Sequence, residues 1–298
     1  IYAESFKGPE HLAQVQILLE PMRRNTAPCI GWATYHIYAK NPNANILVTP
    51  ADHLILQEDV FDEAIRRSLE YVREHPKLVT LGVRPSRPET GYGYIQFTDA
   101  EEEHFVKVKT FTEKPNHEMA KVFYESGEFL WNSGMFAWNV RTILDAFNLH
   151  LPALTSVLDE ANGAYATPEE QDRVGAIFSQ CPNISIDYAV LEKADNVMVL
   201  PVDFGWADLG TWGSLYELKR EEPEANVALH TEALFYEAKG NIVSLDGDES
   251  EQLVVVQGID DCIVAQSKGV LLICKRDQEQ RIKEFMGDAS ERYKKKFD

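Results

Sequence analysis

The stretch NILVTPADH, residues 45–53, joins a short apolar run to a Thr-Pro break and then to a carboxylate, Asp52. The run at 46–48 does not alternate with polar residues. This pattern predicts a strand covered on both faces, as in the parallel sheets of α/β domains. Ligands of such sheets collect at the carboxyl ends of the strands, where Asp52 is expected. A cap of the following helix is the alternative role for Asp52, because Asp is common in such turns.

Composition indicates a globular protein with one large or two smaller domains, since 44% of the 298 residues are hydrophobic. The sequence shows no long apolar run and no charged-then-apolar leader, so neither a membrane span nor a signal peptide is predicted. The four cysteines lack CxxC spacing, which is typical of reduced thiols in the cytoplasm. The net charge of −19 disfavours nucleic-acid binding. We therefore expect a cytoplasmic protein with no nucleic-acid and no membrane partner.

A strand–helix–strand pattern follows from the opening stretch. Residues 60–75 place apolar side chains on one helical face and end at Pro76, and residues 78–83, LVTLGV, form another apolar run. The right-handed crossover rule would make the two strands parallel in one sheet. We predict a mostly parallel α/β domain over residues 1–220.

The sequence changes character from about Glu221. Short β runs then recur at roughly ten-residue spacing, separated by glycines, as in small β domains. They lie at 241–245, 253–256, 262–265 and 270–273. We predict that residues 221–298 form a small, β-helix-like C-terminal domain that ends in a helix.

The loop EPMRRNTAP stands between a short apolar run and a predicted helix. Its polar members, Glu20, Arg24, Asn25 and Thr26, can present amide, hydroxyl and backbone groups to a heterocyclic base. A helix N-cap at Thr26 is the alternative, but it explains Thr26 and the following proline without explaining Arg24 and Asn25.

Three further motifs carry polar groups near strand ends. In TGYGYI, Gly93 permits close approach of the backbone to a substrate hydroxyl, although a tight turn explains it equally well. In FTEKP, Glu113 and Lys114 offer an acceptor for sugar hydroxyls and a cation for a phosphate, with a surface ion pair as the alternative. Asn132 interrupts the apolar run FLWNSGMFAW. Its amide must find a partner in the backbone or a ligand, because an unpaired buried amide costs about 1–3 kcal/mol.

Two more carboxylates complete the set. Asp187 opens a predicted helix, and Asp208 follows an apolar strand at 197–202. Asp208 could share a divalent cation with Asp52, because Mg²⁺ binds one or two carboxylates plus substrate phosphates. A helix cap before Thr211 is the alternative for Asp208. We find no Ser-His-Asp or Cys-His arrangement, so the pattern favours catalysis by positioning and charge stabilisation.

The chain resembles the mannose-1-phosphate guanylyltransferases over most of residues 19–216. Seven motifs occur in the order found in that family: EPMRRNTAP, PADH, TGYGYI, FTEKP, FLWNSGMFAW, SIDYAVLEK and WADLGTW. The resemblance implies a Rossmann-like nucleotidyltransferase domain with a small C-terminal β domain, and a homodimer. It also implies a reaction in which an oxygen of mannose 1-phosphate attacks the α-phosphorus of GTP in line, with Mg²⁺ present, to give GDP-mannose and pyrophosphate.

The resemblance further implies a role for each candidate residue. The catalytic residues would be Asp52, Lys114 and Asp208, of which Asp52 and Asp208 would bind Mg²⁺ and Lys114 would lie near the sugar phosphate. Nucleotide binding is implied for Glu20, Arg24, Asn25, Thr26 and Asp52, and sugar binding for Gly93, Glu113, Asn132 and Asp187.

One family feature is not found in the sequence. A glycine-rich loop with an Arg and a following Lys, which would cradle the triphosphate, does not occur between Ile1 and Leu19. We therefore expect the 298 residues to represent a chain truncated at its N-terminus. Two other functions stay open: transfer to another hexose 1-phosphate, and a non-catalytic regulatory homologue that binds a nucleotide sugar.

Overall fold

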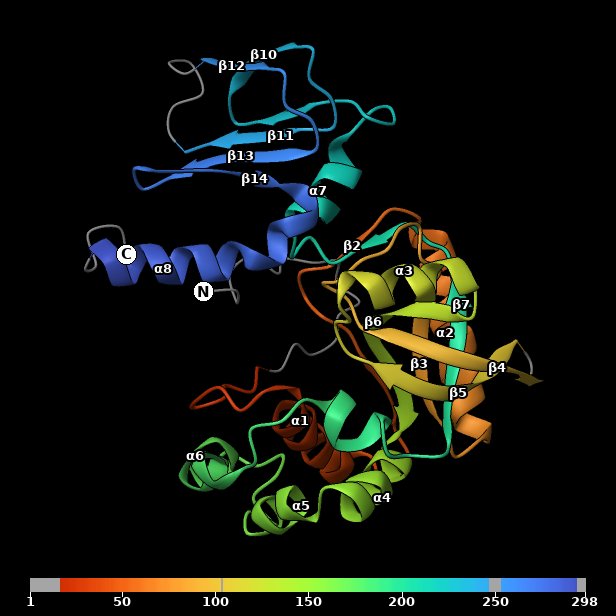
Figure 1. The fold of residues 1–298 in the computed structure, drawn as a ribbon. Helices are drawn as coiled ribbons and strands as arrows, with labels where there is room; N and C mark the ends of the chain where they lie inside the picture. Colours follow the sequence, from red (N-terminus) through yellow and green to blue (C-terminus); the bar gives the residue numbers. More distant parts are fainter. Residues whose placement is uncertain (1–16, 103, 247–252, 294–298) are drawn as a thin grey trace.

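A six-stranded sheet forms the centre of the larger part of the molecule (Figure 1). The computed structural model describes residues 17–102, 104–246 and 253–293. The strand order in the sheet is β1 (Asn45–Val48), β6 (Phe129–Asn139), β3 (Leu78–Val83), β7 (Val197–Val202), β5 (Phe105–Thr112) and β4 (Tyr94–Glu102). β6 also pairs with β4.

The sheet is mixed, so the prediction of a mostly parallel sheet was wrong. β3 and β7 pair in parallel, but β6 lies antiparallel between β1 and β3, and β5 is antiparallel to β7. β1 and β3 share one direction, as the crossover rule requires, without being neighbours. β1 is also less covered than predicted, because Ile46 is its only buried residue. An apolar run indicates burial and not strand direction, and for this reason the pattern did not reveal the place of β6.

Helices cover both faces of the sheet. Leu78 packs in one hydrophobic cluster and its neighbour Val79 in another, as alternate residues of a strand do. α2 (Glu58–Glu74) buries Ala64, Tyr71 and Val72 against one face, close to the predicted helix at 60–75. α1, α4, α5 and α6 gather at one end of the sheet (Figure 1). Their bounds, with those of α3 and the turns η1 and η2, are α1 (Thr26–Lys40), α3 (His117–Ser126), α4 (Val140–His150), α5 (Pro152–Asp159), α6 (Glu170–Ile177), the short 3₁₀ turn η1 (Phe178–Gln180) and the π-helical turn η2 (Asp187–Leu191).

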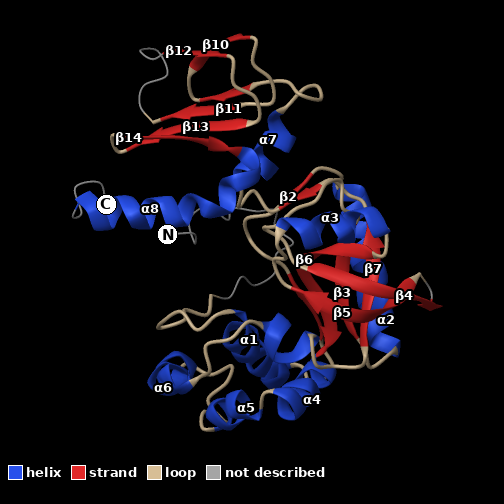
Figure 2. Ribbon diagram, viewed as in Figure 1, coloured by secondary structure: helices blue, strands red, loops and turns tan. Residues whose placement is uncertain are grey.

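The C-terminal strands form a separate group (Figure 2). β9, β11 and β13 pair in parallel, β10 and β12 form a second parallel pair, and β14 is antiparallel to β13. From β9 to β13, successive strands thus alternate between two sheets. The strands are β9 (Val227–Leu229), β10 (Glu232–Tyr236), β11 (Ile242–Leu245), β12 (Leu253–Gln257), β13 (Cys262–Ser267) and β14 (Val270–Lys275). The sequence reading missed β9 and β10, which are short and half-exposed.

The change of architecture falls between α7 (Trp212–Lys219) and β9. The division at residue 220 stays a prediction. After β14 the chain forms the 3₁₀ segment η4 (Arg276–Arg281) and α8 (Ile282–Tyr293), which extends away from the strands (Figure 1). Across the described ranges, no helix is long and apolar enough to cross a membrane. The expectation about a glycine-rich loop before Leu19 concerns residues that lie mostly outside these ranges.

Candidate active site

A two-stranded ladder joins the segments that carry Asp52 and Asp208. β2 (Leu54–Ile55) pairs antiparallel with β8 (Trp206–Ala207), with Leu54 opposite Ala207. His53 directly precedes Leu54 and Asp208 directly follows Ala207, so both segments leave the ladder at the same end, and Asp52 is the residue before His53. Asp52 is exposed and Asp208 is half-buried. The two carboxylates predicted to bind metal therefore lie at the same end of one ladder.

His53 lies within electrostatic reach of both carboxylates. Trp206 donates a hydrogen bond from Nε1 to His53 Nδ1 over 3.0 Å. Because indole can only donate, this bond fixes the neutral tautomer of His53 that carries its proton on Nε2. Burial lowers the pKa of His53, whereas the charges of Asp52 and Asp208 act to raise it. The two carboxylates thus act on one side chain.

The carboxylate of Asp208 is held through one oxygen. Its Oδ1 accepts hydrogen bonds from the Tyr92 hydroxyl at 3.0 Å, from the Gly210 amide at 3.0 Å and from Ser214 Oγ at 3.3 Å. The cap of α7 is Thr211, which forms a reciprocal capping box with Ser214. Capping the following helix was the alternative role considered for Asp208. In the structure, Thr211 is the residue that caps this helix. Among the described residues, no hydrogen bond is directed at Asp208 Oδ2.

The donor chemistry of this pair fits Mg²⁺. Asp52 and Asp208 supply hard oxygen atoms, and Mg²⁺ commonly takes one or two carboxylates together with substrate phosphates and water. Within the part of the chain that the structure describes, no group of three or more His, Cys, Asp or Glu side chains could hold a metal ion. A cation at this pair would therefore complete its coordination with water or with oxygen atoms of a substrate.

The four residues predicted to face the sugar come together beside the sheet. Asn132, in β6, donates from Nδ2 to Asp187 Oδ1 over 2.7 Å, and its backbone amide donates to the Gly93 carbonyl over 2.8 Å. A Cβ atom at Gly93 would lie only 2.7 Å from Glu113 Oε2. Glycine is thus required where the Glu113 carboxylate approaches the backbone. The side-chain oxygen Oδ1 of Asn132 also accepts from the Gly134 backbone amide at 3.2 Å, so the Asn132 side chain contacts both backbone and side-chain groups.

Burial changes the pKa values of the two carboxylates in this group, Glu113 and Asp187. It raises the pKa of Glu113, an effect that Lys114 opposes and Asp187 reinforces. It also raises the pKa of Asp187, against the hydrogen bond from Asn132. Lys114 Nζ lies 3.5 Å from Glu113 Oε1 with its side chain 61% exposed, whereas Glu113 is only 28% exposed. The pair therefore differs from a fully solvated surface ion pair.

The predicted base-binding loop is fixed to the rest of the fold. Asn25, with φ at 68°, is the N-cap of α1 and accepts from the Thr26 amide at 2.9 Å, so the cap is one residue earlier than the alternative reading placed it. Thr26 Oγ1 accepts from the Ile186 amide at 2.9 Å, next to Asp187. Arg24 donates to the Ser179 carbonyl. The loop is thereby tied to the segment that carries a predicted sugar ligand.

Glu20 is placed against a thiol. Partial burial raises the pKa of Glu20, and its hydrogen bond with Cys29 opposes that rise. Burial also raises the pKa of Cys29 to about 11, assisted by the charge of Glu20. Cys29 is therefore a neutral hydrogen-bond partner at pH 7. None of the contacts just described joins Glu20 or Arg24 to Asp52 or Asp208.

Sequence reasoning missed three residues of the site, Tyr92, His53 and Glu89. Tyr92 is 5% exposed, and burial together with the Asp208 charge raises its pKa far above the usual value. Glu89 is 4% exposed and accepts from Arg87 and from the Gly91 amide, each over 2.8 Å. The available signal was the motif that gave Gly93, because a tyrosine beside two glycines already suggested a constrained segment.

In open α/β sheets, ligands bind in a crevice beside the ends of the strands, and polar side chains gather beside the sheet in this way here. Comparison with known families gives the particular family. The model of the nucleotidyl transferase family matches residues 2–224. The chain belongs to this family.

Individual relatives agree with the family assignment. The chain is 36% identical over 290 residues to a mannose-1-phosphate guanylyltransferase of Escherichia coli (strain K12), covering 95% of this chain and 59% of that protein. It is 35% identical over 290 residues to a mannose-1-phosphate guanylyltransferase of Salmonella typhimurium, with the same coverage of 95% and 59%. The chain thus spans less than two thirds of the length of these relatives.

A solved structure is similar over nearly the whole chain. A crystal structure of a mannose-1-phosphate geranyltransferase from Thermus thermophilus matches with a TM-score of 0.77 and 30% identity, covering 93% of this chain and 78% of that one. The similarity therefore extends from the mixed sheet into the C-terminal strands.

Proposed function

We propose that the protein joins GTP and mannose 1-phosphate to give GDP-mannose and pyrophosphate. One observation carries this proposal: the adjacent residues Tyr92 and Gly93 connect the two groups of the site. Tyr92 donates to Asp208, and Gly93 contacts Asn132 and lies against Glu113. A site for a cation and phosphates thus adjoins a site for hydroxyl groups. The relatives named mannose-1-phosphate guanylyltransferase support the choice of substrates.

The sugar end of the proposed site is built from acceptors. Glu113 and Asp187 accept hydrogen bonds from sugar hydroxyls, and Asn132 orients Asp187 through its 2.7 Å bond. The exposed ammonium of Lys114 lies beside Glu113 and offsets the charge of the sugar phosphate. An oxygen of that phosphate attacks the α-phosphorus of GTP, the bond from the α-phosphorus to the bridging oxygen breaks, and pyrophosphate leaves. No enzyme nucleophile is needed.

At the phosphate end, Asp52 and Asp208 would hold Mg²⁺. When bound, the ion screens the charges of the two substrates and stabilises charge on the leaving pyrophosphate. Tyr92, Gly210 and Ser214 keep Asp208 Oδ1 in place. A fixed ligand needs no reorganisation during the reaction, which is the advantage of a preorganised site.

We also propose that Glu20, Asn25 and Thr26 lie against the guanine base. Arg24 contributes to nucleotide binding by holding the loop through the Ser179 carbonyl. The bond from the Ile186 amide to Thr26 Oγ1 supports this assignment, because it links the base loop to the sugar ligand Asp187.

Three wider expectations belong to the same proposal. The alternation of β9 to β13 between two sets of parallel strands supports a short β-helix-like coil in the C-terminal domain. Leu234 and Val255 stand opposite each other on β10 and β12, 46% and 59% exposed, which supports a homodimer. Four free cysteines suit a reducing, cytoplasmic compartment. Light scattering tests the homodimer, and a mass equal to that of one chain would refute it.

A pyrophosphate-release assay on the full-length protein tests the reaction. With GTP and Mg²⁺, we expect release to depend on mannose 1-phosphate and to exceed the release with glucose 1-phosphate. A higher rate with another hexose 1-phosphate would reassign the sugar. Tight GTP binding without pyrophosphate release from any sugar phosphate would refute the proposal in favour of a regulatory homologue.

A further inference from the structure

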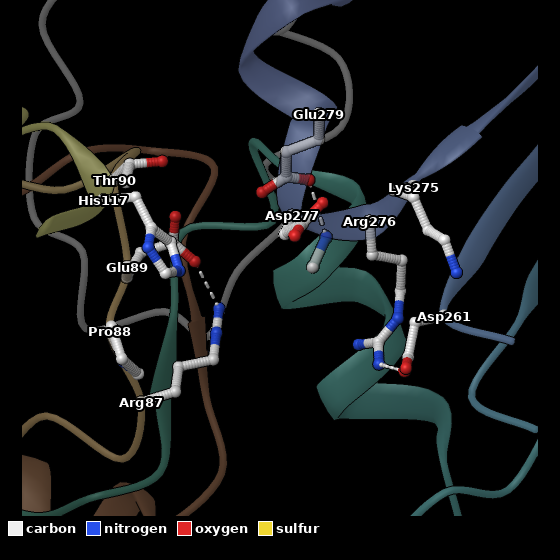
Figure 3. Close-up of a pocket in the computed structure, with 11 residues that line it drawn as sticks. Arg87, Pro88, Glu89, Thr90, His117, Asp261, Lys275, Arg276, Asp277 and Glu279 are labelled. Carbon is white, nitrogen blue, oxygen red and sulfur yellow. Dashed lines mark hydrogen bonds and ion pairs between the residues drawn. The ribbon is translucent and has the colours of Figure 1, made fainter. Parts of the chain in front are cut away.

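The segment η4 of the C-terminal domain lies against the catalytic domain near Asp208. A cavity of about 440 Å³ separates Arg87 and Glu89 on one side from Arg276 and Glu279 on the other. Figure 3 shows Glu279 above α7, with its carboxylate bonded to the helix, and the paired Arg87 and Glu89 on the opposite side of the cavity. Residues far apart in the sequence therefore meet here.

Glu279 binds the first turn of α7. Its Oε2 accepts a hydrogen bond from the Gly213 amide over 2.8 Å, and a Cβ atom at Gly213 would lie 3.2 Å from Glu279 Oε1. A carboxylate at this place satisfies an amide that has no partner inside the helix and complements the helix dipole. The hydroxyl of the next residue, Ser214, shares its one proton between Asp208 Oδ1 at 3.3 Å and the Thr211 carbonyl at 2.9 Å. Glu279 thus binds the residue directly before a hydrogen-bond donor to Asp208.

The neighbouring residue, Gln280, reaches a second support of Asp208. A Cβ atom at Gly91 would lie 3.0 Å from Gln280 Nε2, so the two residues are in close contact. Gly91 precedes Tyr92, whose hydroxyl donates to Asp208 Oδ1. The segment η4 therefore touches the immediate neighbours of two of the three donors to this carboxylate.

The same segment is fastened to the β domain and to α7. The Arg276 guanidinium lies 3.8 Å from the centre of the Tyr216 ring, in α7, and bonds Asp261 over 2.7 Å. Burial raises the pKa of Glu279, and its bond with Gly213 opposes that rise. A half-buried carboxylate between two fixed elements is suited to setting their relative position.

We propose that Glu279 is a positioning residue that orients Asp208 for the binding of a divalent cation. The C-terminal β domain would thus complete the active site, although Glu279 itself touches neither metal nor substrate. The metal role of Asp208 rests on the function proposed above.

The test measures pyrophosphate release by the full-length protein at varied Mg²⁺. In Glu279→Ala we expect the half-saturating Mg²⁺ concentration to rise roughly tenfold, as when other groups that orient metal ligands are removed. The KM for mannose 1-phosphate should not change, because none of the contacts of Glu279 described above reaches the proposed sugar ligands Gly93, Glu113, Asn132 and Asp187. Glu279→Gln should recover most of the wild-type Mg²⁺ response, since its amide oxygen still accepts from Gly213.

Asp277→Asn is the matched control, because Asp277 is an exposed carboxylate on the same segment. It should respond to Mg²⁺ like the wild type. Ser214→Ala and Glu279→Ala should be non-additive if both act on Asp208. The proposal is overturned if Glu279→Ala leaves the half-saturating Mg²⁺ concentration unchanged, or if Asp277→Asn raises it as much as Glu279→Ala does. It is also overturned if Glu279→Ala raises only the KM for mannose 1-phosphate.

A direct measurement of cation binding distinguishes a failure of the positioning role of Glu279 from a failure of the proposed reaction. If the wild type releases no pyrophosphate, the reaction is refuted, and free Mn²⁺ is then measured by electron paramagnetic resonance with GTP present. Weaker Mn²⁺ binding by Glu279→Ala still supports the positioning role. Equal binding, or no binding by the wild type, overturns it. Circular dichroism checks folding, and Glu279→Asp, which retracts the carboxylate, replaces an alanine variant that does not fold.

Discussion

At the scale of single residues, the site depends on how its carboxylates are held. Asp52 and Asp208 were predicted from the sequence, and so were Asn132 and the three predicted sugar ligands around it. Their partners could not be predicted, because the bond from Tyr92 to Asp208 joins residues 116 positions apart. A sequence shows which side chains can accept a proton or a cation. The packing of distant segments decides which donors hold them.

Asp208→Asn should abolish turnover and leave the fold intact. Asparagine keeps an oxygen that accepts from Tyr92, but it loses the charge needed by the cation, so we expect kcat to fall at least about 100-fold. Pyrophosphate release measures kcat and thermal unfolding measures Tm. Asp203→Asn, at an exposed carboxylate just after β7, is the control. Normal activity in Asp208→Asn would refute the metal assignment.

Asp187→Asn should stabilise the protein at neutral pH. Burial raises the folded-state pKa of Asp187 above its unfolded value. The contribution of this carboxyl is therefore fully present below the unfolded pKa and is lost as pH rises through the folded pKa. Asparagine does not titrate and can still accept from Asn132. Its advantage over the wild type, measured by urea unfolding, should shrink as the pH is lowered from neutral towards the unfolded pKa; an equal difference at both ends would contradict this.

Lys114→Ala should weaken the use of sugar phosphate more than the binding of GTP. The ammonium lies beside Glu113, in the part of the site proposed to bind the sugar. Loss of one exposed charge contact to a phosphate should raise the KM for mannose 1-phosphate by about three- to tenfold, since such a contact is worth roughly 1 kcal/mol. Steady-state kinetics with each substrate varied in turn measures this. An equal loss for both substrates would argue against the placement of Lys114.

At the scale of elements, the sequence predicted what depends on local pattern. The strands at 78–83 and 197–202 are confirmed as β3 and β7, and the helix at 60–75 is confirmed within two residues as α2. The pairing was not predictable, because β6 contacts β1, β3 and β4, which come from distant parts of the chain. Hydrophobic pattern reports burial, whereas the neighbour of a strand is a property of the whole sheet.

One helix is held in place by a buried carboxylate of no proposed catalytic role. Glu170, 5% exposed at the start of α6, accepts from Trp32 Nε1 at 2.7 Å and from the Ala166 amide at 2.8 Å, and pairs with His36 Nδ1 at 2.6 Å. The network joins α6 to α1, the helix that follows the predicted base-binding loop.

Glu170→Ala should therefore reduce the free energy of unfolding by about 2–4 kcal/mol, because it leaves buried donors without their carboxylate. The KM for mannose 1-phosphate should stay unchanged. Urea unfolding and steady-state kinetics measure the two effects, with Glu169→Ala at the exposed neighbouring carboxylate as the control. A cost below about 1 kcal/mol, or an effect equal to that of the control, would show that the network is not a main link between the helices.

At the scale of the whole molecule, the proposed reaction requires an acidic protein to bind two polyanionic substrates. A net charge of −19 repels phosphates over the general surface. Local cations and a divalent metal ion must then offset that field at the site. The placement of Asp52 and Asp208 at one end of the β2–β8 ladder, with Lys114 at the sugar end, meets this need. The contact of η4 with α7 would make the C-terminal domain a part of the proposed active site.

A crystal structure of the full-length protein with GDP-mannose and Mg²⁺ tests the central claim most directly, because it places both halves of the product at once. The account predicts that the mannose hydroxyls lie within hydrogen-bond distance of Glu113 and Asp187, and that the diphosphate and Mg²⁺ lie beside Asp52 and Asp208. A mannose bound away from Gly93 and Asn132, or a Mg²⁺ that contacts neither aspartate, would contradict it.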